Sequence, residues 1–431
     1  MNSVEVLLLN ALLYTLTLFY FYFKYKMSVG VIVWVLYTVS AWSSFLFIQQ
    51  PNYASSIHAS EQTLLPCIYL YIVLVLAMAP LMRVNKIESI DFTNYRILKY
   101  IIIVCTAIQI MFFLLDIPAM LRVIQSGSGM LKELRSTVYG GDESISLLSQ
   151  NAVLNRLKNL FSGIRVLATG LSVITFFACK KDRKLIIAFA ISALLNNIRI
   201  IIVQIGRGEM ILIFLLYVCT IYMMRDWINE RAKRKIFIIG LPIVIIGGSF
   251  FWTISVSRFG KYAGFFMYKY LGEPINNFNG LLFNNIKGMT GGRAYFATFY
   301  ELFSGEKAAV NANEKWQLIQ SMTGIRGDIF YTWVGGLVIE FGKIMSFFVA
   351  GILNRLLNRL SRIKEYYSGD LFVILFFLNF YIRGIFNFPT QNLEGMLMIL
   401  YTSVLYIVFR VRKVDGRLLF RLPSASKSHR R

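Results

Sequence analysis

The chain has 431 residues, of which 57% are hydrophobic and 16% are charged, against roughly 45–50% and about 25% in a soluble domain. This composition excludes an ordinary soluble protein of two or three domains. The formal net charge of +23 would suit a nucleic-acid-binding protein. More than half of the 45 Lys and Arg, however, stand in short segments between apolar runs or in the tail, as in membrane proteins. We therefore expect a membrane-embedded protein with no nucleic-acid partner.

Apolar runs near the ~20 residues needed to cross a bilayer recur along the chain. They predict an all-α fold, a polytopic transmembrane helical bundle of about eleven spans. The first run has no basic residue before it and no small-residue cleavage site after it, so we interpret it as a permanent span rather than a signal peptide. The predicted spans are residues 4–23, 27–48, 64–82, 99–118, 157–178, 185–205, 209–224, 236–255, 331–353, 371–388 and 394–409.

Charge orients this bundle. The short loops on one side, residues 49–63, 206–208 and 389–393, contain a single basic residue, Arg207, whereas the connections on the other side are rich in Lys and Arg. By the positive-inside rule the N-terminus lies outside and the C-terminus in the cytoplasm. Residues 1–410 are then one transmembrane domain, and residues 411–431 are a basic cytoplasmic tail.

Two outer segments, about 119–156 and 256–330, are much longer than a connection requires. The second is rich in aromatic residues and glycine, a composition that disfavours disorder. We expect it to fold back over the spans, with short helices at the membrane interface.

Arginines within apolar segments are costly and usually functional. Arg165, Arg199 and Arg383 fall inside predicted spans, towards their outer ends, and Arg207 lies in a GRGE turn between two spans. Because the guanidinium group forms bidentate hydrogen bonds with phosphate, this pattern predicts an outward-facing site for an anion, with Arg199 and Arg207 facing one cavity. The alternative is internal ion pairing, for which Asp116 is a candidate partner.

Other polar residues give weaker signals. Glu340 and Lys343 are spaced to pair with each other along a helix. His58 is expected to be solvated in the first outer loop. The four cysteines and two histidines show no metal-ligand spacing, so we expect no metal site and no cofactor.

The motifs between Arg199 and Gly351 suggest a family. GRG between two spans is followed by an outer loop that reads YKYLGEPINNFNGLLFNN and GGRAYFATFYELFSG, and then by GDIFYTWVGGLVIEFG leading into the next span. This order resembles the Wzy-type oligosaccharide repeat-unit polymerases of bacterial O-antigen and capsule synthesis, with Glu340 where aspartate is usual. Some members pair an arginine with a glycine eleven positions away. Arg258 and Arg293 lack that partner, so this role is not transferred to them.

The resemblance implies a glycosyltransferase of the bacterial plasma membrane whose substrate is an undecaprenyl-diphosphate-linked oligosaccharide. It also implies a chain-length regulator and a flippase as partners. The sequence contains no DxD-type carboxylate pair, so cationic side chains would have to stabilise the diphosphate leaving group. The candidates are Arg165, Arg199, Arg207, Arg293, Arg326 and Arg383. With no histidine in the large loops, the candidates for a general base are Glu301, Asp328 and Glu340.

Two alternatives share parts of this pattern. An O-antigen ligase has the same architecture and lipid donor but typically uses a histidine in the large outer loop. A repeat-unit flippase or other transporter usually shows internal repeats, and none is evident here.

Overall fold

The computed structural model describes residues 1–92, 94–126, 151–204, 207–259, 263–307, 309, 312–363, 365–414 and 417–420. Within these residues the chain is predominantly helical, with two pairs of short strands. Most of the first predicted outer segment, about 119–156, and the end of the tail lie outside the described residues.

Eight helices of the described chain are long and apolar enough to cross a membrane. They are α1 (Ser3–Tyr25), α2 (Val29–Ile48), α3 (Leu64–Met78) with its 3-10 extension η1 (Ala79–Arg83), α4 (Tyr95–Leu115), α7 (Ala152–Ala178), α8 (Arg183–Gln204), α14 (Thr332–Leu360) and α16 (Leu393–Arg410). The other three predicted spans also correspond to helices, α9 (Arg207–Met223), α10 (Glu230–Phe259) and α15 (Ser368–Arg383). The helical bundle is therefore confirmed, whereas eleven membrane crossings stay a prediction.

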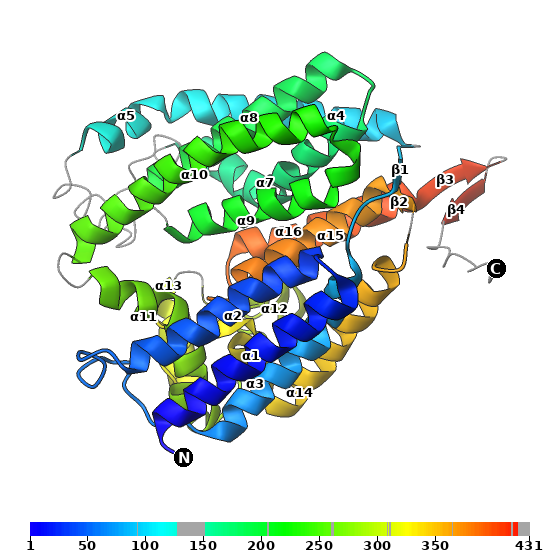
Figure 1. The fold of residues 1–431 in the computed structure, drawn as a ribbon. Coiled ribbons are helices and arrows are strands. Elements are labelled where there is room, and N and C mark those ends of the chain that lie inside the picture. Colours follow the sequence, from blue (N-terminus) through cyan, green and yellow to red (C-terminus); the bar gives the residue numbers. More distant parts are fainter. Residues whose placement is uncertain are drawn as a thin grey trace.

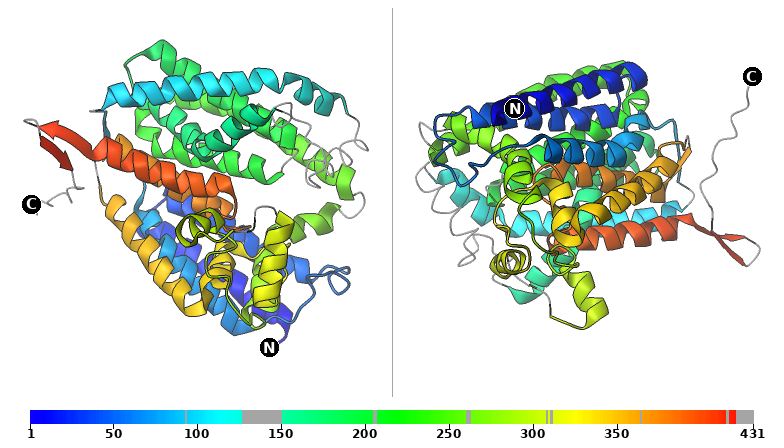
Figure 2. Two further views of the ribbon diagram at one scale, coloured as in Figure 1. Left: turned by 180° about the vertical axis from the view of Figure 1, so that it is seen from behind. Right: turned by 90° about the horizontal axis from the view of Figure 1, so that it is seen from below.

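The helices pack as two groups with a pair between them (Figures 1 and 2). In one group α1 packs on α2 and α3 on α14; in the other α4 and α7 pack on α8. Helices α15 and α16 pack on each other and join the groups, because α15 also contacts α2, α7, α9 and α14. Large aromatic side chains where α2, α14 and α15 meet, including Tyr37, Trp333 and Tyr381, are almost completely buried. They belong to one hydrophobic core cluster that extends through both helix groups.

The second of the two predicted outer segments, about 256–330, folds back onto the bundle, as expected. It contains α11 (Ala263–Asn276), a π-helical segment η5 (Asn277–Phe283), α12 (Ala297–Ser304) and α13 (Ala312–Thr323). Helix α11 crosses α2 so closely that a Cβ atom on Gly272 would lie 2.5 Å from the backbone nitrogen of Ser44. The Ser40 hydroxyl donates to the Leu271 carbonyl at 2.6 Å. Only a residue without a side chain permits this approach, so Gly272 sets where α11 lies.

Helix α14 is interrupted at Gly342, whose φ of 77° is not helical. The predicted span 331–353 is therefore not one continuous helix. A break leaves backbone carbonyls without their intrahelical donors, and these need other partners when buried. Here the backbone N–H of Thr290 donates to the Ile339 carbonyl and that of Gly291 to the Glu340 carbonyl, both at 3.0 Å. The outer segment thus supplies the hydrogen bonds that the broken helix lacks.

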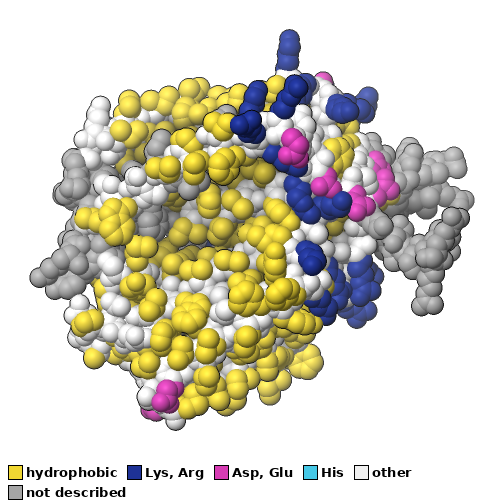
Figure 3. Space-filling model, viewed as in Figure 1, with side chains coloured by type: hydrophobic (Ala, Val, Ile, Leu, Met, Phe, Trp, Pro, Cys, Tyr) yellow, Lys and Arg dark blue, Asp and Glu magenta, His cyan; other side chains and the backbone are white. Residues whose placement is uncertain are grey.

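Lys and Arg gather at one end of the bundle, where β1 (Ser89–Asp91) pairs in parallel with β2 (Glu365–Tyr367) (Figure 3). We call this the basic end. The tail begins there as an antiparallel pair, β3 (Val411–Val414) and β4 (Arg417–Phe420). A completely buried pair, Arg410 with Asp370, ties α16 to α15 at this end. The segregation of charge expected from the sequence is visible at this end.

Candidate functional site

Four charged side chains from four helices form one ion-pair network, the arginine–glutamate cluster of Arg165, Glu209, Arg383 and Glu394. Arg165 Nη2 lies 3.2 Å from Glu209 Oε2 and 2.8 Å from Glu394 Oε1. Arg383 Nη2 lies 2.6 Å from Glu209 Oε1 and 3.4 Å from Glu394 Oε1. Each carboxylate therefore bridges both arginines, and the cluster holds two guanidinium groups side by side.

Helix ends favour this arrangement. Glu209 lies in the first turn of α9 and Glu394 in the first turn of α16, where the positive end of the helix dipole stabilises a carboxylate. Arg383 lies in the last turn of α15, where the negative end stabilises a cation. Arg165 comes from within α7. Four chain segments far apart in sequence thus bring complementary charges and dipoles to one place.

The cluster is only partly sealed. The side chains of Glu209, Glu394 and Arg383 keep 21%, 18% and 16% of their accessible surface, and Arg165 keeps 6%. Arg165 Nη1 is buried and has no hydrogen-bond partner within the described part of the chain. A buried charged donor without a partner is costly. An anionic oxygen beside Nη1 would satisfy it with a charge-assisted hydrogen bond.

Aromatic side chains lie next to the start of α9. The Tyr270 hydroxyl is 2.9 Å from the position that a Cβ atom on Gly208 would take. The Tyr270 ring packs on Phe386, with centroids 4.8 Å apart, and edge-on against Phe330. Gly208, one residue from Glu209, therefore lets α11 place an aromatic group close to the cluster.

Of the predicted phosphate ligands, Arg165 and Arg383 come together, whereas Arg199 is held apart. Arg199 Nη1 lies 2.6 Å from Asp116 Oδ2, and its Nε donates to the side-chain oxygen of Asn196. The side chains of this pair are 6% and 0% exposed. The alternative of internal pairing with Asp116 is therefore confirmed for Arg199. The side chain of Arg207 lies outside the described residues.

Glu340 accepts hydrogen bonds from the outer segment instead of pairing with Lys343, which lies over an aromatic ring. Its Oε2 accepts from the Thr290 hydroxyl and from the Gly292 backbone N–H, each at 2.6 Å. Its Oε1 accepts from the Tyr295 backbone N–H. The side chain is fully buried. Glu340 thus fastens the segment 288–296 into the break of α14, and both of its oxygens are engaged.

The other two predicted carboxylates lie on the outer segment. Asp328 forms a bidentate pair with Arg326, at 3.0 Å and 2.6 Å. Hydrogen bonds from that guanidinium hold the pKa of Asp328 below its usual value and keep the carboxylate ionised. Glu301 is exposed on α12. Arg326, Asp328 and Glu301 are therefore near the surface, and Arg326 pairs with Asp328 and not with a carboxylate of the cluster.

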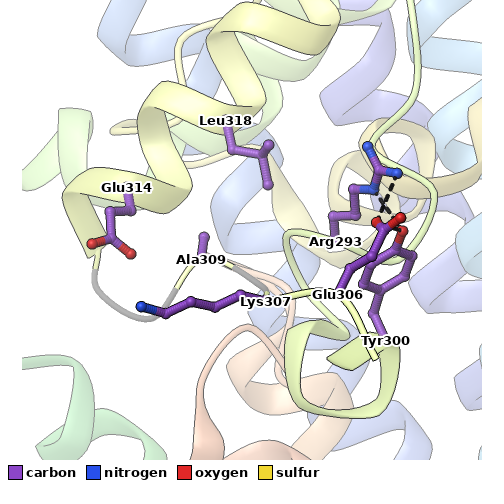
Figure 4. Close-up of a pocket in the computed structure, with 7 residues that line it drawn as sticks. All are labelled: Arg293, Tyr300, Glu306, Lys307, Ala309, Glu314 and Leu318. Atoms are coloured by element: carbon purple, nitrogen blue, oxygen red, sulfur yellow. Dashed lines mark hydrogen bonds and ion pairs between the residues drawn. The ribbon is translucent and has the colours of Figure 1, made fainter. Parts of the chain in front are cut away.

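A pocket of about 430 Å³ opens between the α12 region and α13 (Figure 4). It is lined by Arg293, Tyr300, Glu306, Lys307, Ala309, Glu314 and Leu318. Arg293 Nε donates to the Tyr300 hydroxyl at 2.9 Å, and its Nη2 lies 3.2 Å from Glu306 Oε2. The Tyr300 hydroxyl donates to the same Glu306 oxygen at 2.6 Å. The predicted phosphate ligand Arg293 therefore belongs to this pocket, which we call the outer pocket, and not to the cluster.

His58 is buried and not solvated, so that expectation was wrong. Its Nδ1 lies 2.9 Å from the side-chain oxygen of Asn277, and its Nε2 lies 3.2 Å from Glu273 Oε2. The amide nitrogen of Asn277 donates to a backbone carbonyl, so its oxygen faces His58 and Nδ1 is the donor. The first outer loop folds onto α11 and η5, which the sequence did not indicate.

Sequence reasoning missed the carboxylates that complete the cluster. Glu209 stands in the GRGE motif, and Glu394 opens the last predicted span. Each is the first residue of a predicted span, at the same end of the bundle as the arginines of the other spans, and this was the available signal. No group of three or more His, Cys, Asp or Glu side chains in the described parts of the chain could hold a metal ion.

Comparison with known proteins adds no family. No family model matches the chain, and no curated protein or solved structure is significantly similar to it.

Proposed function

We propose that the chain is a membrane glycosyltransferase that polymerises undecaprenyl-diphosphate-linked oligosaccharide repeat units, with Arg165 and Arg383 holding the diphosphate. The observation that supports this proposal is the arginine–glutamate cluster. It places two guanidinium groups side by side in a low-dielectric environment, partly open, with one buried donor unsatisfied. Preorganised cations of this kind stabilise the charge that develops on a leaving diphosphate.

In the proposed reaction the bond between the anomeric carbon of the growing chain and its diphosphate breaks. A hydroxyl of the incoming unit forms the new glycosidic bond, and its proton passes to a base or to water. Glu209 and Glu394 orient the two arginines before the substrate binds, and the phosphate oxygens then share those donors. For the base, Glu301 is the better candidate, because both oxygens of Glu340 already accept hydrogen bonds and both oxygens of Asp328 accept from Arg326.

The two alternatives gain no support from the site. A ligase would need an accessible histidine, and His58 is 2% exposed. A flippase would need charges that substrate can reach through the depth of the bundle, and the Arg410–Asp370 pair at the basic end is sealed.

The first experiment separates a binding cluster from a structural one. We would compare the single variants Arg383→Gln and Glu209→Gln with the double variant, all reconstituted with lipid-linked repeat units. Each single variant leaves a charge without its partner and should be destabilised, whereas the neutral double variant should recover stability. If Arg383 binds diphosphate, the double variant is abundant but makes no long polymer.

A polymer ladder of normal length from the double variant would show that Arg383 is structural. The control is Lys86→Gln with Asp226→Asn, an exposed ion pair at the basic end, which should not affect the ladder.

The second experiment tests the proposed location, a bacterial plasma membrane with the N-terminus outside and the C-terminus in the cytoplasm. All four native cysteines are buried, so single cysteines introduced on the surface can be labelled selectively. In intact cells an impermeant reagent should reach cysteine at Asn52 or Ala309 and not at Arg231. Labelling of Arg231 would reverse the orientation and place the cluster on the wrong side for a lipid-linked substrate delivered by a flippase.

A further inference from the structure

The outer pocket differs chemically from the cluster. Its charged lining consists of two cations, Arg293 and Lys307, and two carboxylates, Glu306 and Glu314. These charges balance, so the pocket has no net preference for a strongly anionic ligand such as a diphosphate. Its volume of about 430 Å³ falls within the ~300–1,000 Å³ typical of small-molecule sites.

Its polar groups suit a ligand rich in hydroxyl groups. Arg293 offers N–H donors in a fixed plane, Glu306 offers acceptor oxygens, and the Tyr300 hydroxyl can serve as either. A sugar hydroxyl is likewise both donor and acceptor, and neighbouring hydroxyls match planar guanidinium and carboxylate groups. The guanidinium carbon of Arg293 lies 5.1 Å from the centre of the Tyr300 ring. Leu318, extending from α13, adds an apolar surface for the carbon face of a sugar ring (Figure 4).

The rest of the structure holds this pocket in place. Glu340 accepts the backbone N–H groups on both sides of Arg293, from Gly292 and Tyr295, and so fixes the backbone that carries the guanidinium. The Thr390 hydroxyl donates to the Tyr295 carbonyl at 3.2 Å. Groups fixed before binding lose less entropy when a ligand arrives.

The pocket is also joined to the cluster through α16. Ala297 at the start of α12 packs on Met396, two residues from Glu394 of the cluster. Lys315 of α13, next to the pocket residue Glu314, donates to the Gln391 carbonyl. Both walls of the pocket therefore contact the segment from which the cluster draws one of its carboxylates.

We propose that the outer pocket binds a neutral sugar ring of the lipid-linked oligosaccharide, while the diphosphate of such a substrate lies at the arginine–glutamate cluster. This assignment rests on the proposed function. It makes Arg293, Tyr300 and Glu306 saccharide ligands and Glu340 a positioning residue that holds Arg293.

The test measures binding without turnover. Purified protein in nanodiscs is titrated calorimetrically with two probes: the reducing oligosaccharide released by mild acid from the native host's lipid-linked units, and inorganic pyrophosphate. Glu306→Gln and Tyr300→Ala should weaken oligosaccharide binding at least tenfold and leave pyrophosphate binding unchanged. The neutral double variant Arg383→Gln with Glu209→Gln should do the reverse. Tyr268→Ala, which removes an exposed tyrosine of α11 outside the pocket, is the matched control and should change neither.

The assignment of the pocket would be wrong if the wild type does not bind the oligosaccharide, or if both pocket variants bind it as tightly as the wild type. A third outcome is that the wild type binds the oligosaccharide and the pocket variants do not, but the wild type fails to extend lipid-linked units. The saccharide site would then stand, and the polymerase proposal would be wrong.

Discussion

Two of the arginine–carboxylate arrangements that join helices in this bundle differ in how open they are. Arg410 and Asp370 at the basic end form a single pair with no exposed side-chain surface. In the arginine–glutamate cluster two arginines share two carboxylates, and three of the four side chains keep between 16% and 21% of their surface. Both arrangements neutralise charge, but the buried donor Arg165 Nη1 belongs to a network whose other side chains keep accessible surface, so a ligand oxygen could engage it, whereas Arg410 lies in a sealed pair.

Ion pairing therefore does not by itself distinguish a structural arginine from a binding one. A sealed one-to-one pair leaves its guanidinium no room to exchange partners. A shared and partly open network can exchange a carboxylate oxygen for a phosphate oxygen without exposing either charge. Substitutions at the sealed pair should therefore lower mainly the stability of the protein, and substitutions at the cluster should lower mainly its activity.

The largest expected effect is on stability at the sealed pair. Asp370→Asn leaves Arg410 as a buried charge without its counter-ion and should cost about 3–5 kcal/mol of unfolding free energy. Denaturation in detergent, followed by loss of helical signal, measures this cost. Adding Arg410→Met to the same chain should restore most of the stability. A single variant as stable as the wild type would contradict a structural role for this pair.

The next effect is on activity at the open cluster. Arg383→Lys keeps the positive charge but loses the planar fork, so it should lower the polymerisation rate while the protein stays abundant. Loss of one hydrogen bond to a charged group, roughly 1.5–3 kcal/mol, corresponds to a rate about 10–100-fold lower. Rates at matched membrane abundance measure it. An unchanged rate would make the cluster as purely structural as the sealed pair.

A smaller effect is expected where Glu340 fastens the outer segment. Glu340→Gln keeps the shape of the side chain but loses the negative charge and one acceptor. The free energy needed to open the segment 288–296 should therefore fall by about 1–3 kcal/mol. Hydrogen exchange of the Gly292 and Tyr295 amides would report this. The pH dependence of the remaining activity should keep its wild-type form. Loss of one titration step from that profile would instead identify Glu340 as the general base.

The smallest effect is expected at the exposed Arg326–Asp328 pair, whose side chains are 46% and 36% accessible. Asp328→Asn should cost less than about 1 kcal/mol near neutral pH. The pKa of Asp328 is lowered in the folded state. Its ionised carboxylate therefore contributes to the free energy of unfolding above the unfolded-state pKa of ~3.9, and this contribution is lost as the pH falls below that value. The stability difference between variant and wild type should therefore vanish in acid. A difference that grows below that pH would mean that the carboxylate is not stabilised by Arg326.

Much of the fold followed from local pattern. Each of the eleven apolar runs forms a helix, and the aromatic, glycine-containing segment 256–330 folds into short helices against the bundle, as its composition indicated. The break of α14 was not anticipated, because Gly342 inside an apolar run is compatible with a continuous helix until another segment supplies its hydrogen bonds.

Three features could be predicted from the sequence: the helical, membrane-type architecture, the segregation of charge to one end, and the arginines in apolar segments. Length, hydropathy and charge position are local properties, so these features can be read along the chain. The tertiary structure alone decided which carboxylate meets which arginine. Arg165 finds its partners 44 and 229 positions away, and Arg383 reaches back 174 positions to Glu209. Such pairs form because helix packing buries the charges together and a buried charge must be neutralised, and no spacing along one helix encodes that choice.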